Sequence, residues 1–486
     1  MTGMTQPERI TFLRPGQPRK GRYVLYWMQS AVRSVHNQAL DYATSEANRL
    51  GLPVLVVFGL TPSYPSANAR HYQYLLEGLR DAHAGLRRRG LPLLIGLTGE
   101  HGPAEAALSL AADAALIVTE RAYLRHLRAW REWLSGQLEM QHPELSLAQI
   151  ESELIVPLEV TSGKQEYAAR TIRPKITRAL EKYLVAEEEQ TPAHTLPQLP
   201  SPAGMKWLDP AQLAAPAALI ASFGVEGVPP GEEEGGEVAA QAQLQQFLTR
   251  LDHYDQDRND PTLDGSSRLS AYLHYGHVSA LQVALAVQGH GGPGAAAYLE
   301  ELIVRRELSF NLCAYNDQYD SFAVLPDWAR KTLRDHQHDD HEHLYTQGEL
   351  EAADTHDPYW NAAQRQMMLT GRMHNYMRMY WGKKVLEWTP DPAQAHATLV
   401  YLNDKYEQDG RNPNSYAGIG WVFGLHDRPW ARRPIFGTVR YMNAGGLRRK
   451  FDIDRYARKW NGPATISAAG KAAGRIEQVG EQSRST

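Results

Sequence analysis

The sequence has very little of what secreted and membrane-spanning proteins depend on. Its 486 residues include a single cysteine, Cys313, which excludes a framework of internal disulfides and favours a reducing compartment. No apolar run reaches the length of a membrane span, and the N-terminal residues contain no apolar signal-peptide core. We therefore expect an intracellular, cytoplasmic protein with no membrane partner.

A strong excess of one charge is also absent, which taken alone argues against nucleic acid as a partner. The 51 Lys and Arg residues against 55 Asp and Glu leave a formal charge of −4. The charges are unevenly placed, however: residues 411–459 contain eleven Lys or Arg and three Asp, whereas acidic runs lie at 186–189 and 231–237. A basic C-terminal face is suited to phosphate contacts, although a solvated surface explains any one of these arginines equally well.

Short apolar runs alternate with amphipathic stretches in the first part of the chain, which is typical of a parallel sheet covered by helices. The expected helices lie at 34–50 and 68–89, before Gly51 and Gly90. The expected buried strands lie at 22–29, 53–60, 91–98, 114–120 and 153–160. No G-x-G-x-x-G follows the first run, so a site of the NAD type is not expected there.

Composition divides the chain into four parts. Residues 20–185 form the expected Rossmann-like α/β domain. Proline, alanine, glycine and glutamate dominate 186–239, which we interpret as a connector between domains that is mobile in part. Helical periodicity prevails over 240–461, which predicts an all-α domain, and the small, polar residues of 462–486 predict a disordered tail.

The most informative stretch is 355–388, THDPYWNAAQRQMMLTGRMHNYMRMYWGKKVLEW, where tryptophans accompany arginines and methionines with almost no acid. Thr355 and Asp357 with Pro358 predict the start of a helix. After Gly371, one stripe of a second helix carries Asn375, Arg378, Trp381, Val385 and Trp388. A guanidinium beside spaced indoles suits an anionic redox cofactor with an electron path to the surface, although tryptophans at helical spacing also form ordinary cores.

The segment G-S-S-R-L-S at 265–270 precedes a helical run. Glycine, hydroxyls and a guanidinium at the start of a helix can hold phosphate through backbone N–H groups. Serine at such a position is more often simply a helix cap. The segment alone is therefore a weak indication of a phosphate site.

The segment H-Q-H-D-D-H-E-H at 336–343 has the residue types of a metal site. A fully hydrophilic run of this kind is more often a solvated loop, and no second ligand cluster completes a closed site. We predict that this protein binds no metal.

Four segments resemble, in the same order, those of the class II cyclobutane pyrimidine dimer photolyases in the photolyase/cryptochrome superfamily. They are NDPTLDGSSRLSAYLHYGHVS (259–279), LEELIVRREL (299–308), YWGKKVLEW (380–388) and YLNDKYEQDGRNPN (401–414). The resemblance spans roughly residues 20–460. It implies an α/β domain joined by a long connector to an all-α domain that binds FAD.

The resemblance implies which residues bind FAD. The residues expected near the pyrophosphate are Tyr254, Ser266, Ser267, Arg268, Leu269 and Ser270. Arg378 and Asp409 match the pair beside the isoalloxazine ring, where Arg378 stabilises negative charge on the reduced flavin and Asp409 holds the guanidinium. Asn403 matches the class II asparagine facing flavin N5, with Asn414 as the alternative. Without the family, the run 401–414 is explained by an ordinary turn.

The resemblance also implies a pocket for a DNA lesion that has left the duplex. The residues expected on the lesion side are Arg258, Asn259, Glu301, Met379 and Trp421. Arg440, in the basic segment 431–443, is the candidate for a phosphate contact. Other branches have a tryptophan three residues after the equivalent of Glu301, and this sequence has Val304 there.

The same resemblance implies a photoreduction chain of Trp381, Trp360 and Trp388. Trp381 is expected nearest the flavin and Trp388 near solvent, with Tyr345 as a candidate extension of the route. All three tryptophans are present.

The implied function is that of a deoxyribodipyrimidine photo-lyase. Under blue or near-ultraviolet light, reduced FADH⁻ lends an electron to a cyclobutane pyrimidine dimer in ultraviolet-damaged DNA, the ring splits and the electron returns. The alternative is a cryptochrome-like FAD photoreceptor without repair activity, against which Glu301, Met379 and Trp421 argue. A helical flavoprotein oxidoreductase is disfavoured because the sequence shows no catalytic acid/base pair. We also expect a monomer and a second, antenna chromophore, a deazaflavin rather than a folate.

Overall fold

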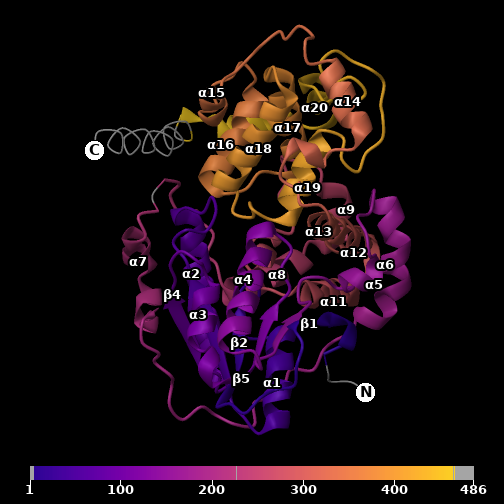
Figure 1. The fold of residues 1–486 in the computed structure, drawn as a ribbon. Coiled ribbons are helices and arrows are strands. Elements are labelled where there is room, and N and C mark those ends of the chain that lie inside the picture. Colours follow the sequence, from indigo (N-terminus) through magenta and orange to yellow (C-terminus); the bar gives the residue numbers. More distant parts are fainter. Residues whose placement is uncertain (1–4, 226, 464, 466–486) are drawn as a thin grey trace.

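The computed structural model describes residues 5–225, 227–463 and 465, so most of the predicted tail lies outside the described residues. An α/β part and a helical part lie against each other: the first is indigo and violet in the lower half of Figure 1, and the second lies to its right in magenta and red-brown and above it in orange. Among the described helices, none is both long enough and apolar enough to cross a membrane.

A seven-stranded sheet with the order β1-β6-β5-β2-β3-β4-β7 forms the centre of the α/β part. The strands are β1 (Ile10–Arg14), β2 (Tyr23–Met28), β3 (Val54–Leu60), β4 (Leu93–Leu97), β5 (Ala114–Glu120), β6 (Leu147–Ile150) and β7 (Lys206–Trp207). The five central strands run parallel, and β1 and β7 pair antiparallel at the two edges. Because the chain returns from β4 to the far side of β2, the carboxyl ends of β2 and β5 form a topological switch point.

Each face of this sheet is covered by its own pair of helices. Even-numbered residues of β2 pack with α1 (Gln38–Leu50) and α2 (Ala69–Arg88), whereas odd-numbered residues pack with α3 (Ala104–Ser109) and α4 (Arg125–Gln141). Side chains alternate across a strand, so a strand covered on both faces must be apolar throughout. This is why β2, with the sequence YVLYWM, is buried at every position.

Four predicted strands are confirmed as β2, β3, β4 and β5, and the two predicted helices as α1 and α2. Helix α1 begins later than expected because Asn37 caps it, its side chain accepting from the N–H of Leu40. Strands β1, β6 and β7 were not predicted. They are short, and two of them lie at the edges of the sheet.

The prediction of a strand at 153–160 is wrong. The N–H groups of Ile155 and Val156 donate to Oε1 of Glu307 at 2.7 and 3.3 Å instead of to a neighbouring strand. Pro157 then precedes the short helix α5 (Leu158–Thr161). This apolar run is buried against helices of the other part of the molecule, a tertiary contact that local pattern does not reveal.

The connector predicted over 186–239 is partly built into the α/β part. It supplies β7, the 3₁₀ helix η3 (Pro210–Ala214) and α7 (Pro216–Ser222), and the last two pack on α2. Helix α6 (Ala169–Tyr183), which precedes the connector, packs in an apolar cluster of the helical part. The bounds of the four predicted parts stay a prediction.

The helical part is organised around two apolar clusters. The first contains α6 with α8 (Glu237–Leu248), α9 (Tyr254–Asp257), α10 (Ser270–His274), α11 (Ala280–His290), α12 (Gly292–Leu299) and the π-helix η5 (Glu300–Arg305). The second contains α13 (Arg306–Tyr315), α14 (Asp327–Asp335), α15 (Gln347–Glu351), α16 (Pro358–Thr370), α17 (Asn375–Trp388), α18 (Pro392–Tyr406), α19 (Pro413–Val422), α20 (Ala444–Lys450) and α21 (Ile453–Trp460). The helix start predicted at Pro358 is confirmed, with Asp357 as its cap.

Arg70, in the first turn of α2, joins the two parts. Its side chain is buried, and its guanidinium donates to five carbonyl oxygens of other segments, those of Pro229 at 3.0 Å, Met367 at 3.2 Å, Met368 at 2.6 Å, Leu369 at 3.5 Å and Tyr406 at 2.8 Å. Burial lowers the pKa of Arg70 to about 10, so it stays charged. The end of α18 is therefore fixed to the α/β part.

Candidate active site

A cleft of about 580 Å³ lies where α10, α16, α17 and α21 approach one another. This volume is in the range of sites for cofactors and small molecules. The charged residues of its lining are Arg268, Arg372, Arg378, Arg455, Lys459, Glu232, Asp264 and Asp409. The basic side chains outnumber the acidic ones, which suits an anionic ligand with two phosphates, such as a dinucleotide.

The loop before α10 supplies hydroxyl groups to this cleft. They belong to Ser266, Ser267 and Ser270. The loop passes close to Asp257 at Gly265, where a Cβ would lie 2.6 Å from the backbone of Asp257, so only glycine fits. Nε2 of Gln243 donates to the backbone oxygen of Ser267 at 2.8 Å and holds the loop in place. Hydroxyl groups beside Arg268 can donate hydrogen bonds to phosphate oxygens.

An ion pair lies at the inner end of the cleft. Nη2 of Arg378 is 2.9 Å from Oδ1 of Asp409, and the two residues are 31 positions apart in the sequence. The same nitrogen is 2.8 Å from Oε2 of Glu407. Nε of Arg378 donates to the carbonyl oxygen of Met373 at 3.2 Å, which fixes the orientation of the guanidinium.

Both members of the pair Arg378–Asp409 are ionised. Burial acts to raise the pKa of Asp409, but the charge of Arg378 and the hydroxyl of Ser270 outweigh burial and hold that pKa below its usual range. Burial likewise acts to lower the pKa of Arg378, and the charge of Asp409, joined by that of Glu407 when Glu407 is ionised, reverses this effect. A positive charge of fixed orientation therefore faces the cleft.

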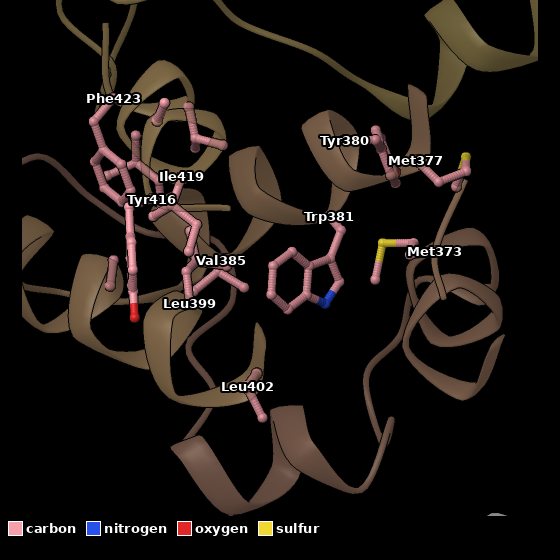
Figure 2. Packing of buried hydrophobic residues seen from close by; sticks show 14 of the residues in the cluster. Met373, Met377, Tyr380, Trp381, Val385, Leu399, Leu402, Tyr416, Ile419 and Phe423 are labelled. Atoms are coloured by element: carbon pink, nitrogen blue, oxygen red, sulfur yellow. The ribbon is translucent and has the colours of Figure 1, made fainter. Parts of the chain in front are cut away.

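The three tryptophans expected to form an electron path are in contact with one another. The ring centroids of Trp381 and Trp360 are 6.5 Å apart with nearly parallel planes, and those of Trp360 and Trp388 are 5.7 Å apart. Figure 2 shows Trp381 in the apolar cluster that also contains Met373 and Val385. Trp381 lies about one helical turn after Arg378 on α17, so the path starts near the cleft.

The far end of this path differs in detail from the expectation. Trp388 is itself buried, with 2% of its surface exposed. Its ring packs on Tyr345 at 5.3 Å and on His356 at 5.2 Å, and His356 is exposed. Tyr345 donates to, or accepts from, Nδ1 of His356 at 2.7 Å. The rings that reach solvent are therefore those next to Trp388.

Three of the residues predicted to bind FAD do not belong to the lining of the cleft as the structure describes it. Leu269 is fully buried. Asn403 is buried, and its Nδ2 donates to Oδ1 of Asp404 at 2.9 Å. Asn414 is exposed in the first turn of α19. The other predicted FAD residues line the cleft: Tyr254, Ser266, Ser267, Arg268, Ser270, Arg378 and Asp409.

The residues predicted on the lesion side fall into separate groups. Nη1 of Arg258 is 2.6 Å from Oε1 of Glu301, and the guanidinium lies over the ring of Tyr254, which lines the cleft. Glu301 belongs to the π-helix η5, a rare form that is frequent at functional sites. Asn259 is exposed beside this group.

The remaining lesion-side residues lie on α17, on α19 and in the segment after α19. Met379 is half-buried on α17. Trp421 has 36% of its surface exposed, and Arg440 lies over the ring of Trp430 at 5.1 Å. That these residues and the pair Arg258–Glu301 line one pocket for the lesion stays a prediction.

Sequence reasoning missed several residues of the site. Helix α21 places Arg455, Tyr456 and Lys459 on the lining of the cleft, although its basic residues looked like a DNA-binding face. Glu407 was missed because a lone glutamate two positions before Asp409 resembles part of a turn. Only the fold brings it to Arg378.

A second, smaller cavity of about 130 Å³ lies at the switch point of the sheet. It is lined by the loops after β2, β3 and β5, and its aromatic residues include Phe58, Tyr64, Tyr72, Trp130 and Phe310. Arg411 also lines it, buried, with no hydrogen-bond partner for Nε among the described residues. One wall is shared with the cleft, because Ser270 and Asp409 face the cleft while His274 and Arg411, on the same segments, face the cavity.

The histidine-rich segment 336–343 holds no arrangement of ligands in this structure. Nδ1 of His336 is 2.6 Å from Oδ2 of Asp339, which also accepts from the N–H of Ile435 at 2.8 Å. Among the described residues, no group of three or more His, Cys, Asp or Glu side chains could hold a metal ion.

Comparison with known proteins agrees with this geometry. A model of the family DNA photolyase matches residues 24–200. The deoxyribodipyrimidine photo-lyase of Methanothermobacter thermautotrophicus is 46% identical over 94% of this chain and 99% of that protein. Those of Oryza sativa subsp. japonica and Potorous tridactylus are 43% and 38% identical over 92% and 90% of this chain, and over 89% and 80% of their own lengths.

Solved structures share the fold at low sequence identity. A class III photolyase of Agrobacterium tumefaciens superposes with a TM-score of 0.65 at 18% identity, over 96% of this chain and 99% of that one. A cryptochrome of Synechocystis superposes with a TM-score of 0.65 at 17% identity, over 92% and 88%. A photolyase of Sulfolobus tokodaii, solved with two FAD molecules, superposes with a TM-score of 0.66 at 16% identity, over 92% and 93%. The predicted α/β and helical parts are thus confirmed.

Proposed function

The chain belongs to the DNA photolyase family, and from this premise we propose that it is a class II enzyme that splits cyclobutane pyrimidine dimers in ultraviolet-damaged DNA. Its activity is that of a deoxyribodipyrimidine photo-lyase. The observation that carries the proposal furthest is the ionised pair Arg378–Asp409 at the inner end of a basic, hydroxyl-lined cleft.

The residues of the cleft fit FAD. Ser266, Ser267, Ser270 and Arg268 would hold the phosphates, and Arg378 would face the flavin ring with its charge kept in place by Asp409. When bound and reduced, FAD supplies the electron that light makes available, and the protein supplies orientation, charge and exclusion of water. We retain Asn403 over Asn414 as the residue at flavin N5, because Asn414 lies on the surface.

The assignment to class II is supported by the tryptophan path. Trp381, Trp360 and Trp388 occupy two neighbouring helices and form a continuous series of ring contacts. Such a series would let an electron pass from the surface to the cleft, where it would be available to a bound flavin. Val304, where other branches have tryptophan, agrees with the same assignment.

A photoreceptor without repair activity is the alternative, since a cryptochrome shares the fold. The ion pair of Arg258 with Glu301 beside the cleft favours repair, because a polar group there can bond the carbonyl and N–H edges of pyrimidine bases that have been flipped out of the duplex. We therefore expect a DNA partner for this face. A monomeric state and a cytoplasmic location stay predictions.

Repair can be tested directly on purified protein. With FAD, reductant and blue light it should restore DNA that carries cyclobutane dimers, and it should fail to do so in the dark. Glu301→Ala should lose most of this repair and keep FAD. Loss of FAD in that variant would show that Glu301 belongs to the cofactor site, and flavin photochemistry without repair in the unaltered protein would favour the photoreceptor.

The smaller cavity is our candidate for the second chromophore. Its aromatic lining at the switch point suits a flat ring system, and the photolyase of Sulfolobus tokodaii was solved with two FAD molecules. Its volume of about 130 Å³ is close to that of cavities that accept benzene, so a three-ring chromophore enters only if lining side chains turn outward. We propose a deazaflavin rather than a folate. Reconstitution with each compound, read as transfer of excitation to FAD, distinguishes them.

A further inference from the structure

Glu407 is a deeply buried carboxylate that shares one nitrogen of Arg378 with Asp409. The two carboxylate oxygens lie 2.8 and 2.9 Å from Nη2 of Arg378. The side chain of Glu407 is 1% exposed, against 14% for that of Asp409. Two acids therefore compete for one guanidinium, and the deeper of them is out of reach of water.

The backbone prevents Glu407 from moving away from this contact. Its N–H donates to the oxygen of Asn403 at 2.9 Å at the end of α18, and its oxygen accepts from the N–H of Gly410 at 3.0 Å. That oxygen also lies 3.2 Å from Nε2 of His71. A Cβ at Gly410 would lie 2.8 Å from the oxygen of Asn403, so the turn needs glycine.

Charged and titratable groups of several elements surround Glu407. They are Arg378 of α17, Asp409 of the same turn, Arg372 before α17, Arg70 and His71 of α2, and Tyr456 of α21. Arg372 is paired with Glu233 at 2.8 Å, and Arg70 donates to backbone oxygens. The strongest positive partner of Glu407 is Arg378, which it has to share.

Two carboxylates this close, in a buried site with one guanidinium, cannot both be ionised without a large cost. Burial raises the pKa of Glu407 to about 8, an effect that Arg378 opposes and the charge of Asp409 increases. The pKa of Asp409 is instead held below its usual range by Arg378 and the hydroxyl of Ser270, although burial acts the other way. At neutral pH the proton of the pair therefore resides on Glu407.

We propose that Glu407 is a positioning residue that holds a proton beside the cofactor cleft. As a neutral acid it leaves the positive charge of Arg378 free to interact with Asp409 and with an anionic cofactor. As a carboxylate it competes with both for that guanidinium. The part that concerns the cofactor rests on the proposed binding of FAD. A neutral Glu407 favours the negatively charged, reduced flavin, so the midpoint potential of bound FAD should fall more steeply once Glu407 ionises.

The proton can be observed without any cofactor. Infrared difference spectra of flavin-free protein, unaltered minus Glu407→Gln, should show the carbonyl stretch of a protonated carboxylic acid at pH 6 that disappears as the pH rises through about 8. Absence of this signal, or its loss only in Asp409→Asn, would overturn the proposal. If Glu407→Gln does not fold, ¹³C NMR of unaltered protein with labelled glutamate side chains gives the same titration.

The role of the proton is tested by the potential of bound FAD. Glu407→Gln imitates the neutral acid, so it should bind FAD, match the potential of the unaltered protein at pH 6, and lack the steeper fall near pH 8. Equal pH dependence in both proteins would contradict the role in tuning the cofactor. If the unaltered protein binds no FAD, the proposed function fails, while the titration of flavin-free protein still decides where the proton lies.

Discussion

The two cavities share one wall, and the arginine that lines each of them has different partners. In the cleft, Arg378 contacts two carboxylates. In the smaller cavity, the one hydrogen bond that the Arg411 side chain makes to a described residue is to the hydroxyl of Tyr275, at 3.2 Å, and its guanidinium lies over the ring of Tyr64. A paired guanidinium gives a charge of fixed position, whereas the guanidinium of Arg411 is open to a further acceptor. The fixed charge of Arg378 suits a catalytic site, and the guanidinium of Arg411 suits the binding of a ligand that offers an acceptor.

The largest effect is expected where the paired arginine is removed. Arg378→Met leaves the Asp409 carboxylate without its cationic partner in a site that water partly reaches, and should lower the free energy of unfolding by about 1–3 kcal/mol. FAD binding should be lost as well. Chemical denaturation and flavin fluorescence measure the two effects, and a stable variant that still binds FAD would contradict the assigned role of the pair.

Replacing one tryptophan near the cleft and one in the smaller cavity should distinguish electron transfer to the flavin from light harvesting. Trp381→Phe should keep FAD and lose most of its photoreduction, because the ring nearest the cleft no longer passes an electron. Trp130→Phe, in the smaller cavity, is the matched control and should photoreduce FAD at the normal rate. Transient absorption measures both, and normal photoreduction in Trp381→Phe would remove the proposed path.

The unpaired arginine should matter less for stability. Arg411→Met should cost about 2 kcal/mol or less, because it removes one hydrogen bond to Tyr275 but also a buried donor, Nε, that has no partner in the part of the chain that the structure describes. The variant should bind FAD normally and take up the second chromophore poorly. Thermal unfolding and reconstitution report these outcomes. Loss of FAD equal to that in Arg378→Met would mean that the two cavities are not distinct sites.

The smallest effect is expected at the hydroxyls of the cleft. Ser267→Ala should weaken FAD binding by about 1 kcal/mol, roughly fivefold, through the loss of one hydrogen bond to phosphate. Titration of flavin-free protein with FAD gives the dissociation constant. An unchanged constant would place the phosphates elsewhere in the cleft.

Local pattern predicted the elements whose residues decide their own structure. The strands β2 and β3 are apolar throughout and β5 is apolar up to Thr119, as expected for strands that helices cover on both faces, and Pro358 with Asp357 marks the start of α16. The strand at 153–160 failed because its N–H groups bond Glu307, which is far away in the sequence. The short edge strands carry too few residues for a clear period.

The site shows the same limit. The resemblance brought Arg378, Asp409 and the serines of 266–270 to attention, and the structure gathers them around one cleft. The resemblance did not point to Glu407. The role of Glu407 depends on its burial and on its shared contact with Arg378, and the sequence shows neither. The residues of α21 that line the cleft were missed for a similar reason, because a basic helix is typical of a surface that binds nucleic acid.

The roles proposed for Arg378, Asp409 and the tryptophans depend most on which cavity holds the flavin. A crystal structure of the protein reconstituted with FAD decides this question. We predict FAD in the polar cleft, with its phosphates at Ser266–Ser270 and its ring beside the guanidinium of Arg378. FAD found only in the aromatic cavity beside Arg411, with the cleft empty, would contradict the account.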